Sequence, residues 1–192
     1  MGYYSSDALT TGCWNTALGI NSLGASTTGC YNIAIGELAL GGAVTTGSRN
    51  IALGLNAMDA LTSGACNIAM GINALGAATT GSLNIAMGKL AMGTGVTTGD
   101  YNIAIGCKAG FCITSGASNI FIGPLSGNQG TTLTGDDNIA IGQTALACTV
   151  TGSDNIAIGR SALAVSGGVA DLNIAIGKSA LGGANVSGEG NI

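Results

Sequence analysis

The chain is built around a five-residue segment, Asn-Ile-Ala-Ile-Gly, in which a single alanine separates two branched aliphatic residues. Successive side chains of a strand point to opposite faces, so this pattern predicts a short β-strand with the aliphatics on one face and Asn, Ala and Gly on the other. We expect the aliphatic pair, such as Ile103 and Ile105, to face the core. A third inward side chain, a Leu or Met, is expected from a second short strand. These residues are Leu40, Met58, Leu75, Met92, Leu146, Leu163 and Leu181.

The segment recurs along nearly the whole chain at spacings of 17 to 19 residues. A unit of that length is too short for a helix pair or a propeller blade, which need roughly 33 residues or more. We therefore predict one all-β domain over residues 1–192, a parallel β-solenoid or β-roll of about ten 17–18-residue coils. The asparagines that mark the repeats are Asn15, Asn32, Asn50, Asn67, Asn84, Asn102, Asn119, Asn138, Asn155, Asn173 and Asn191. Stacked at one position, they are expected to form a structural side-chain amide ladder that satisfies backbone groups at the corners.

A Thr-Thr-Gly element precedes most of the asparagines. Its first Thr is replaced by Leu133, Val150 and Val186 in later coils, which indicates an inward slot. The second Thr or Ser is then expected to point outward, as a plain β-favourable surface or as a hydroxyl array that organises water. This candidate surface-binding column consists of Thr11, Thr28, Thr46, Ser63, Thr80, Thr98, Ser115, Thr134 and Thr151. The Gly after each pair and the Gly closing each strand are expected at corners with positive φ.

Composition excludes several function classes. The chain has 35 Gly, one Pro, no His and a net charge of -4, and only 7% of its residues are charged. Five cationic residues in an acidic chain do not suit a nucleic-acid platform. Without His the commonest general base and metal ligand is missing. Apolar runs stay far below membrane-spanning length, so no membrane insertion is expected.

Candidate chemistry is sparse. Asp136, Asp137 and Asp154 lie in adjacent coils and could hold a cation, but they lack the register of calcium-binding β-rolls, and a solvated corner is preferred. No nucleophile, base and orienting group can be assembled from the repeated residues. We predict that the protein is not an enzyme and has no catalytic, cofactor-binding or metal-binding residues.

The six cysteines do not form an obvious framework. Cys13 and Cys30 occupy the same slot in adjacent coils, which brings their Cα atoms near the disulfide range of about 4.4–6.8 Å. Cys112 and Cys148 share a slot two coils apart, and Cys66 and Cys107 have no slot partner. This scatter favours reduced thiols over a disulfide scaffold, and whether Cys13 and Cys30 pair stays open. No Cys-x-x-Cys spacing occurs, which argues against zinc.

Two irregularities bear on assembly. In the Asn119 coil the usual Ala-Leu becomes Ser126-Gly127, and residues 127–130 lengthen the spacing to 19, which predicts a bulging loop or a small recognition loop. The chain also stops in mid-motif at Ile192, so we expect a segment of a longer fibre or ends covered by other subunits. With few inward side chains per coil, we expect several chains to pack laterally through the outward Asn-Ala-Gly face.

The motif Asn-Ile-Ala-Ile-Gly-x-x-Ala-Leu with Thr-Thr-Gly-Ser before the next Asn resembles the head repeats of trimeric autotransporter adhesins. It is similar also to repeats in bacteriophage and marine-virus tail fibres, where a Thr-Thr-Gly spacer is common. The resemblance covers residues 10–192. It implies a left-handed parallel β-roll that trimerises and serves as a rigid adhesive or host-recognition shaft. The chain departs from these relatives in its longer coil and in its cysteines.

The sequence thus predicts a structural and adhesive fibre segment, a virion tail-fibre or adhesin shaft or head, located on a virion or at the cell surface. Its expected partners are copies of itself, as a homotrimer or in lateral or end-to-end assembly, and a host cell-surface glycan or receptor, with no nucleic acid. One alternative is an ice-binding β-solenoid that uses the Thr column and the flat Ala-Gly face. The other is an open-ended extracellular filament subunit.

Overall fold

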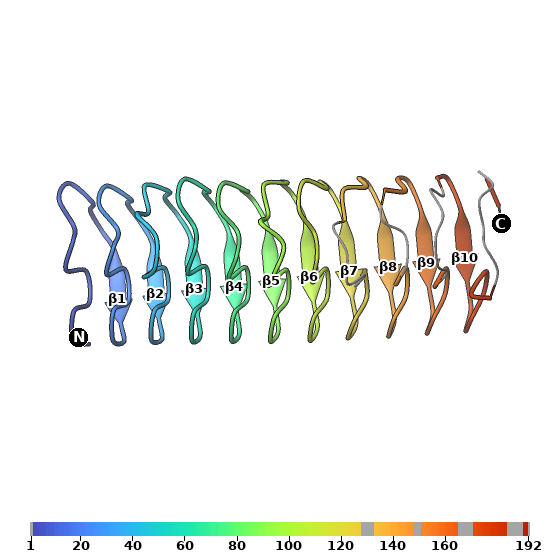
Figure 1. The fold of residues 1–192 in the computed structure, drawn as a ribbon, viewed down its shortest axis with the longest axis horizontal. Helices are drawn as coiled ribbons and strands as arrows, with labels where there is room; N and C mark the ends of the chain where they lie inside the picture. Colours follow the sequence, from blue (N-terminus) through green and yellow to red (C-terminus); the bar gives the residue numbers. More distant parts are fainter. Residues whose placement is uncertain (1, 128–132, 148–150, 165–170, 184–189, 192) are drawn as a thin grey trace.

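The computed structural model describes all residues except 1, 128–132, 148–150, 165–170, 184–189 and 192. Each coil contributes one three-residue strand, and the ten strands follow one another in a single row (Figure 1). The strands are β1 (Thr16–Leu18), β2 (Ile33–Ile35), β3 (Ile51–Leu53), β4 (Ile68–Met70), β5 (Ile85–Met87), β6 (Ile103–Ile105), β7 (Ile120–Ile122), β8 (Ile139–Ile141), β9 (Ile156–Ile158) and β10 (Ile174–Ile176).

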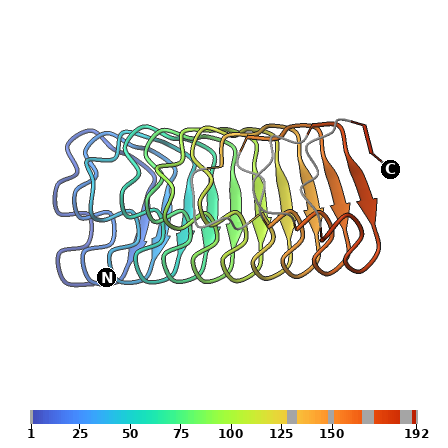
Figure 2. The same ribbon diagram turned by 45° about the vertical axis from the view of Figure 1, so that its right-hand side comes forward.

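The strands form one parallel sheet in sequence order, from β1 to β10. Each residue pairs with the residue at the same position of the motif in the next coil, as in Ile103 with Ile120 and Ile105 with Ile122. Figure 2 shows the sheet on one side of the rod and the winding chain on the other. The prediction of an all-β parallel β-solenoid with repeats of about 17 residues is confirmed, and no helix occurs among the described residues.

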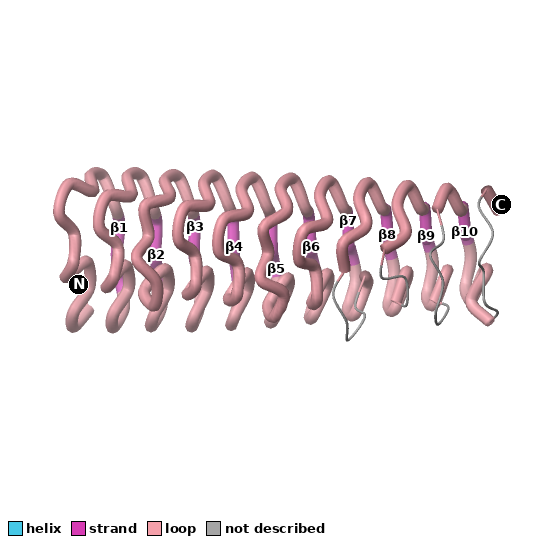
Figure 3. Tube along the Cα trace, turned by 45° about the horizontal axis from the view of Figure 1, so that its top comes forward, coloured by secondary structure: helices cyan, strands magenta, loops and turns pink. Residues whose placement is uncertain are grey.

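Among the described residues, the remainder of each coil consists of loops and turns (Figure 3). The second short strand expected from the sequence is absent from the described part of the chain, where the one isolated bridge outside the sheet joins Ile113 to Leu133. The expected Leu or Met residues from Leu40 to Leu163 are buried and Leu181 is half-buried, but their backbone is left-handed, with φ of 50° at Leu40 and 47° at Met92. A turn, not a strand, therefore carries the third inward side chain.

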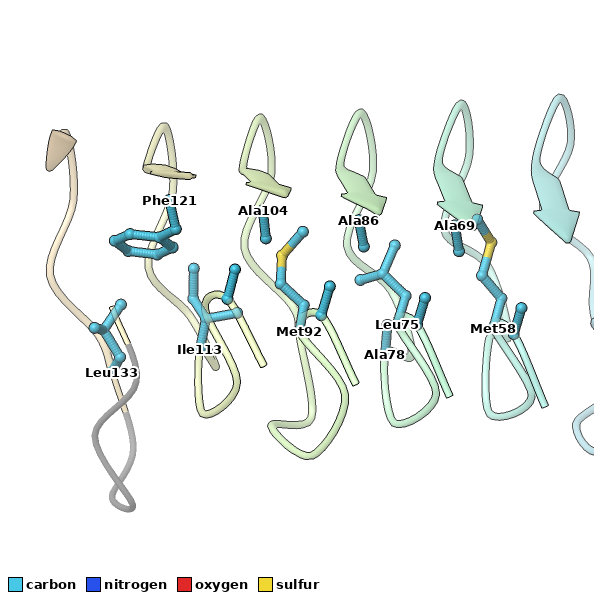
Figure 4. Close-up of a cluster of buried hydrophobic side chains, with 14 of the residues drawn as sticks. Met58, Ala69, Leu75, Ala78, Ala86, Met92, Ala104, Ile113, Phe121 and Leu133 are labelled. Carbon is cyan, nitrogen blue, oxygen red and sulfur yellow. The ribbon is translucent and has the colours of Figure 1, made fainter. Parts of the chain in front are cut away.

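The two faces of the strands are reversed relative to the expectation. The central alanine points inward, and Ala34, Ala69 and Ala104 are fully buried. The flanking aliphatics point outward, and Ile105 keeps 38% of its surface exposed. Figure 4 shows the reason in β4 to β6: the inward alanine, such as Ala104, lies opposite a Leu or Met of the turn, such as Met92, so the thin coil has room for only a methyl group on the strand side.

Phe121 is the exception that tests this explanation, since it replaces the inward alanine in β7. The turns that face its ring carry Gly110 and Gly127 where other coils carry Leu or Met. A Cβ at Gly110 would lie 2.9 Å from Phe121 Cδ2, and one at Gly127 would lie 2.5 Å from Phe121 Cδ1. The ring therefore fills the volume that Leu and Met fill elsewhere, and Ser126-Gly127 is a packing compensation.

The two sets of corner glycines serve different purposes. The glycines that close the strands have positive φ, 137° at Gly54 and 136° at Gly106, as expected. The described glycines after the Thr pair do not have positive φ, which corrects the prediction for that set. At Gly47 a Cβ would overlap the carbonyl oxygen of Gly64 in the next coil, so close backbone approach is what demands glycine there.

The described residues contain no helix that is long and apolar enough to cross a membrane.

Candidate functional site

The largest unusual surface is the outer side of the ten-stranded sheet, which we call the aliphatic face. It contains the first and third residue of every strand, and all of them except Thr16 are Ile, Leu or Met. Among the most exposed are Leu18 at 52%, Ile35 at 38% and Ile176 at 66%. A contiguous apolar surface of this kind is rare on soluble monomers and marks interaction sites.

The aliphatic face is a regular grid. Strands in a sheet lie about 4.8 Å apart, so its ten rungs span about 43 Å, and the two side chains of each rung are about 7 Å apart along the strand. The in-register pairing of every neighbouring strand pair keeps both rows straight. The face carries no charged residue, and it therefore suits a partner with the same spacing along its own surface.

Two columns of corner residues, all exposed except the half-buried Cys66, border the aliphatic face. The pre-Asn column holds the residue before each repeat asparagine, and the post-Gly column holds the residue after each strand-closing glycine. In the coils of β1 to β6 these columns are mostly aromatic or aliphatic, and in the coils of β7 to β10 mostly polar or charged. The pre-Asn column reads Trp14, Tyr31, Arg49, Cys66, Leu83, Tyr101, Ser118, Asp137, Asp154 and Leu172. The post-Gly column reads Ile20, Glu37, Leu55, Ile72, Lys89, Cys107, Pro124, Gln143, Arg160 and Lys178.

The first three members of the pre-Asn column form a stack. The rings of Trp14 and Tyr31 lie 4.8 Å apart and nearly parallel, and the Arg49 guanidinium carbon lies 5.8 Å from the Tyr31 ring centre. Trp14 nevertheless keeps 73% of its surface exposed. An aromatic ring paired on one side and open on the other is suited to pack against the apolar face of a ligand.

The asparagines form a continuous ladder through the rod. Asn84 is typical: its Oδ1 accepts the backbone N–H of Asn102 at 2.8 Å, and its Nδ2 donates to the Gly99 carbonyl at 2.9 Å. The side chain of Asn102 adds a bond to the same Oδ1 at 3.1 Å. The members from Asn32 to Asn173 are buried. Every amide thus links two coils, and the ladder offers no free group for chemistry.

A second ladder was not anticipated from the sequence. Two residues before seven of the asparagines, a side-chain acceptor binds the backbone N–H at the same position of the preceding coil. For example, Ser48 Oγ accepts a hydrogen bond from the backbone N–H of Cys30 at 3.0 Å. Asp136 Oδ1 accepts one from the backbone N–H of Ala117 at 2.7 Å. We call this the acceptor column; its acceptors are Cys30, Ser48, Ser82, Asp100, Asp136, Ser153 and Asp171. The recurrence of Ser, Asp and Cys at this position is the signal that could have predicted it.

The Thr column lies on the surface. Thr11, Thr28, Thr46, Thr80, Thr98, Thr134 and Thr151 are all exposed. The hydroxyl of Thr46 donates to the backbone carbonyl of Thr62 at 3.3 Å, within the next coil. The preceding position is inward, as Thr45, Thr97 and the buried Leu133 show. The Thr column is therefore one residue wide, and at Thr46, Thr98 and Thr134 both neighbours along the chain are buried.

The acidic candidates do not converge on a metal site. Asp136 uses its carboxylate in the acceptor column, and Asp137 and Asp154 are exposed in the pre-Asn column. No group of three or more Cys, Asp or Glu among the described residues is close enough to hold a metal ion.

One carboxylate is placed unusually. Asp59 lies over Gly42 of the preceding coil, and burial raises its pKa above the ordinary value even though a backbone hydrogen bond from Gly42 opposes the shift. Its Oδ1 and that of Asn56 are buried without a hydrogen-bond partner among the described residues.

Several sequence candidates lie outside the described residues. These are Cys148, Val150, Val186 and the lengthened part of the Asn119 coil at 128–132.

Comparison with known proteins adds no relative: no family model, curated protein or solved structure matches this chain.

Proposed function

We propose that this protein is a non-enzymatic fibre segment whose chains associate with copies of themselves through the aliphatic face. The single observation that carries the proposal is that face itself, an uncharged grid of Ile, Leu and Met running along all ten strands. It replaces the Asn-Ala-Gly face as the assembly surface. Ala104 and Ala140 of that earlier assignment are buried in the core and are not available to a partner.

A second copy is the occupant that fits best. Any copy has the same spacing of about 4.8 Å between rungs, so each of the two rows of one face can interdigitate with a row of a neighbouring copy along the whole rod. The face is long enough for a partner to bury on the order of 800 Å² per chain, the size of a standard stable interface. Following the resemblance to trimeric fibre repeats, we propose a homotrimer, with virions or cell surfaces as the setting.

Light scattering coupled to size exclusion tests the assembly. Under reducing conditions we expect a mass near three times 18.4 kDa for the natural chain. Ile105→Glu puts a charge at the centre of the aliphatic face and should release monomers. The matched control is Thr98→Glu, which puts the same charge on the exposed Thr column and should leave the trimer intact. A monomeric natural chain, or an Ile105→Glu trimer, would refute the assembly surface; a mass that grows with concentration would indicate an open-ended filament.

The adhesive part of the proposal rests on the stack of Trp14, Tyr31 and Arg49. Its open indole face suits the apolar C–H face of a sugar ring, and the neighbouring guanidinium suits sugar hydroxyls or carboxylates. We expect the intact rod to bind immobilised cell-surface glycans and Trp14→Ala to reduce that binding strongly. Leu172→Ala, which truncates another exposed apolar side chain in the same column at the other end of the rod, is the control. Equal binding by both variants would rule out the stack as the receptor site.

A specific observation favours the alternative function of ice binding. The Thr column is exposed and in register along the rod, as an ice-binding surface requires. The alanines proposed to flank it are buried, so only the hydroxyl column remains. Thermal hysteresis of the purified chain is the test, and its loss in Thr80→Lys with Thr98→Lys would support this alternative.

A further inference from the structure

The side chain of Cys30 reaches the backbone of Cys13 in the preceding coil. The backbone N–H of Cys13 lies 3.1 Å from Cys30 Sγ, and the backbone carbonyl of Cys13 accepts the N–H of Tyr31 at 3.0 Å. The two residues thus stand at one position of adjacent coils, with their backbones held in register. A hydrogen bond between the thiols raises the pKa of Cys13, with burial as a smaller contribution. Both side chains are half-buried and within reach of a small reagent.

We propose that Cys13 and Cys30 are a redox pair that closes into a disulfide between the first two coils. The thiolate of one cysteine attacks a small-molecule disulfide, such as oxidised glutathione, and one thiol leaves. The second cysteine, deprotonated, then attacks the mixed disulfide and expels the second thiol. The protein loses two protons and two electrons, and the reagent takes them up and is reduced to two thiols, so the exchange balances.

The geometry allows this bond without rebuilding the coil. Residues at one position of neighbouring coils are separated by about the strand spacing of 4.8 Å, inside the usual Cα–Cα range of about 4.4–6.8 Å for disulfides. The side chain at position 30 already leans toward position 13, because the acceptor column requires that direction. Among the described residues the other cysteines lack such a neighbour: Cys66 lies between Arg49 and Leu83 in its column, and Cys107 between Lys89 and Pro124.

The bond would act on the aromatic stack. Cys13 and Cys30 immediately precede Trp14 and Tyr31, whose rings are stacked. A covalent link between the two coils would hold these rings in register and suppress local opening of this end of the rod. The redox state of the surroundings would therefore set the rigidity of the stack that Trp14 forms with Tyr31. The disulfide itself does not depend on whether the proposed fibre function is correct.

Tryptic mapping of the folded full-length chain tests the pair directly. Cleavage after Arg49 gives a peptide of residues 1–49 that contains Cys13 and Cys30 and no other cysteine. The chain is incubated with oxidised glutathione, its free thiols are alkylated, and it is then digested. We expect this peptide to have lost two hydrogens and to carry neither alkyl groups nor glutathione. The peptides with Cys66 and Cys107 should remain alkylated or carry glutathione.

Serine variants provide matched controls. Cys13→Ser and Cys30→Ser should fold, because Ser48, Ser82 and Ser153 occupy the same column naturally. Each variant should retain one thiol in the 1–49 peptide, alkylated or joined to glutathione. In the natural chain, oxidation should slow exchange of the Tyr31 amide hydrogen on the order of tenfold. Alkylation of both cysteines after oxidation, glutathione on both, or a bond to another chain would overturn the proposal.

Discussion

The coils of β1 to β6 and those of β7 to β10 share one core and differ at their borders. In both regions the strand alanine, the turn Leu or Met and the asparagine ladder recur, with one swap at Phe121. Beside the aliphatic face, however, the first region presents Trp14, Tyr31 and Leu83, and the second presents Asp137 and Asp154. The inward positions thus set the fold, and the left-handed corner positions, which lie outside the core, are free to vary with the surface that each end presents.

The largest effect is expected where the two regions are the same, in the asparagine ladder. Asn84→Asp removes the donor to the Gly99 carbonyl and buries a carboxylate beside it, which should cost about 5 kcal/mol of unfolding free energy. Asn138→Asp, beside the Gly152 carbonyl, should cost the same. Denaturant titration measures both. A clearly smaller loss at Asn138 would show that the two regions do not share one core.

The next effect concerns the single core swap. Phe121→Ala should leave a cavity against Gly110 and Gly127 and cost about 3 kcal/mol. Adding Gly127→Leu restores the Ala and Leu pairing of the other coils. Leucine already adopts the required φ at Leu146, 51° against 57° at Gly127, so the double variant should recover much of the loss. Thermal unfolding of the single and double variants checks this. If Gly127→Leu destabilises the Phe121→Ala variant as much as it destabilises the natural chain, Gly127 does not compensate for Phe121.

A moderate effect is expected from making the first region resemble the second. Leu83→Asp places a charge beside the aliphatic face and should weaken self-association about tenfold. The fold should not suffer, because Asp137 and Asp154 adopt the same left-handed backbone at this position. Ser118→Asp is the matched change in the charged region and should alter association little. Sedimentation equilibrium gives the association constants, and equal weakening by both variants would remove the distinction between the regions.

The smallest effect concerns Asp59, a carboxylate in the first region with no counterpart at that position in the other described coils. Its pKa is raised by burial, so the folded state holds its proton more tightly than the unfolded state. Stability should therefore fall as pH rises from the ordinary pKa through the raised one, and stay lower above it. Asp59→Asn should abolish this dependence and stabilise the chain at neutral pH. Denaturant titration from acid to neutral pH measures it; an unchanged profile in the variant would contradict the assignment.

The sequence predicted where the strands lie because the 17- to 18-residue period and the Ile-Ala-Ile pattern are local signals. It misassigned the faces because alternation says which residues share a side, not which side is inward. Ile103 and Ile105 are larger and more apolar than Ala104, and the sequence therefore favours them as the residues that face the core. The deciding quantity is the space between the strand and the opposite turn, which only a methyl group fits, and that space depends on how the whole coil closes.

The candidate site was only partly predictable for the same reason. The contact between Cys13 and Cys30 follows from their spacing of one repeat. The left-handed backbone at Leu40 and Met92 could not be expected, since such residues disfavour that conformation in isolation. It is stabilised here by full burial of their side chains. To predict the acceptor column, one must know that corners of neighbouring coils approach within hydrogen-bond distance.

Photo-crosslinking from the aliphatic face tests the central claim most directly. A diazirine amino acid at position 105, on the exposed side of β6, should give chain-to-chain adducts with aliphatic-face residues of another copy. The same amino acid at position 98, in the exposed Thr column, should give none. Adducts confined to the reagent's own chain, or equal yields at both positions, would contradict assembly through the aliphatic face.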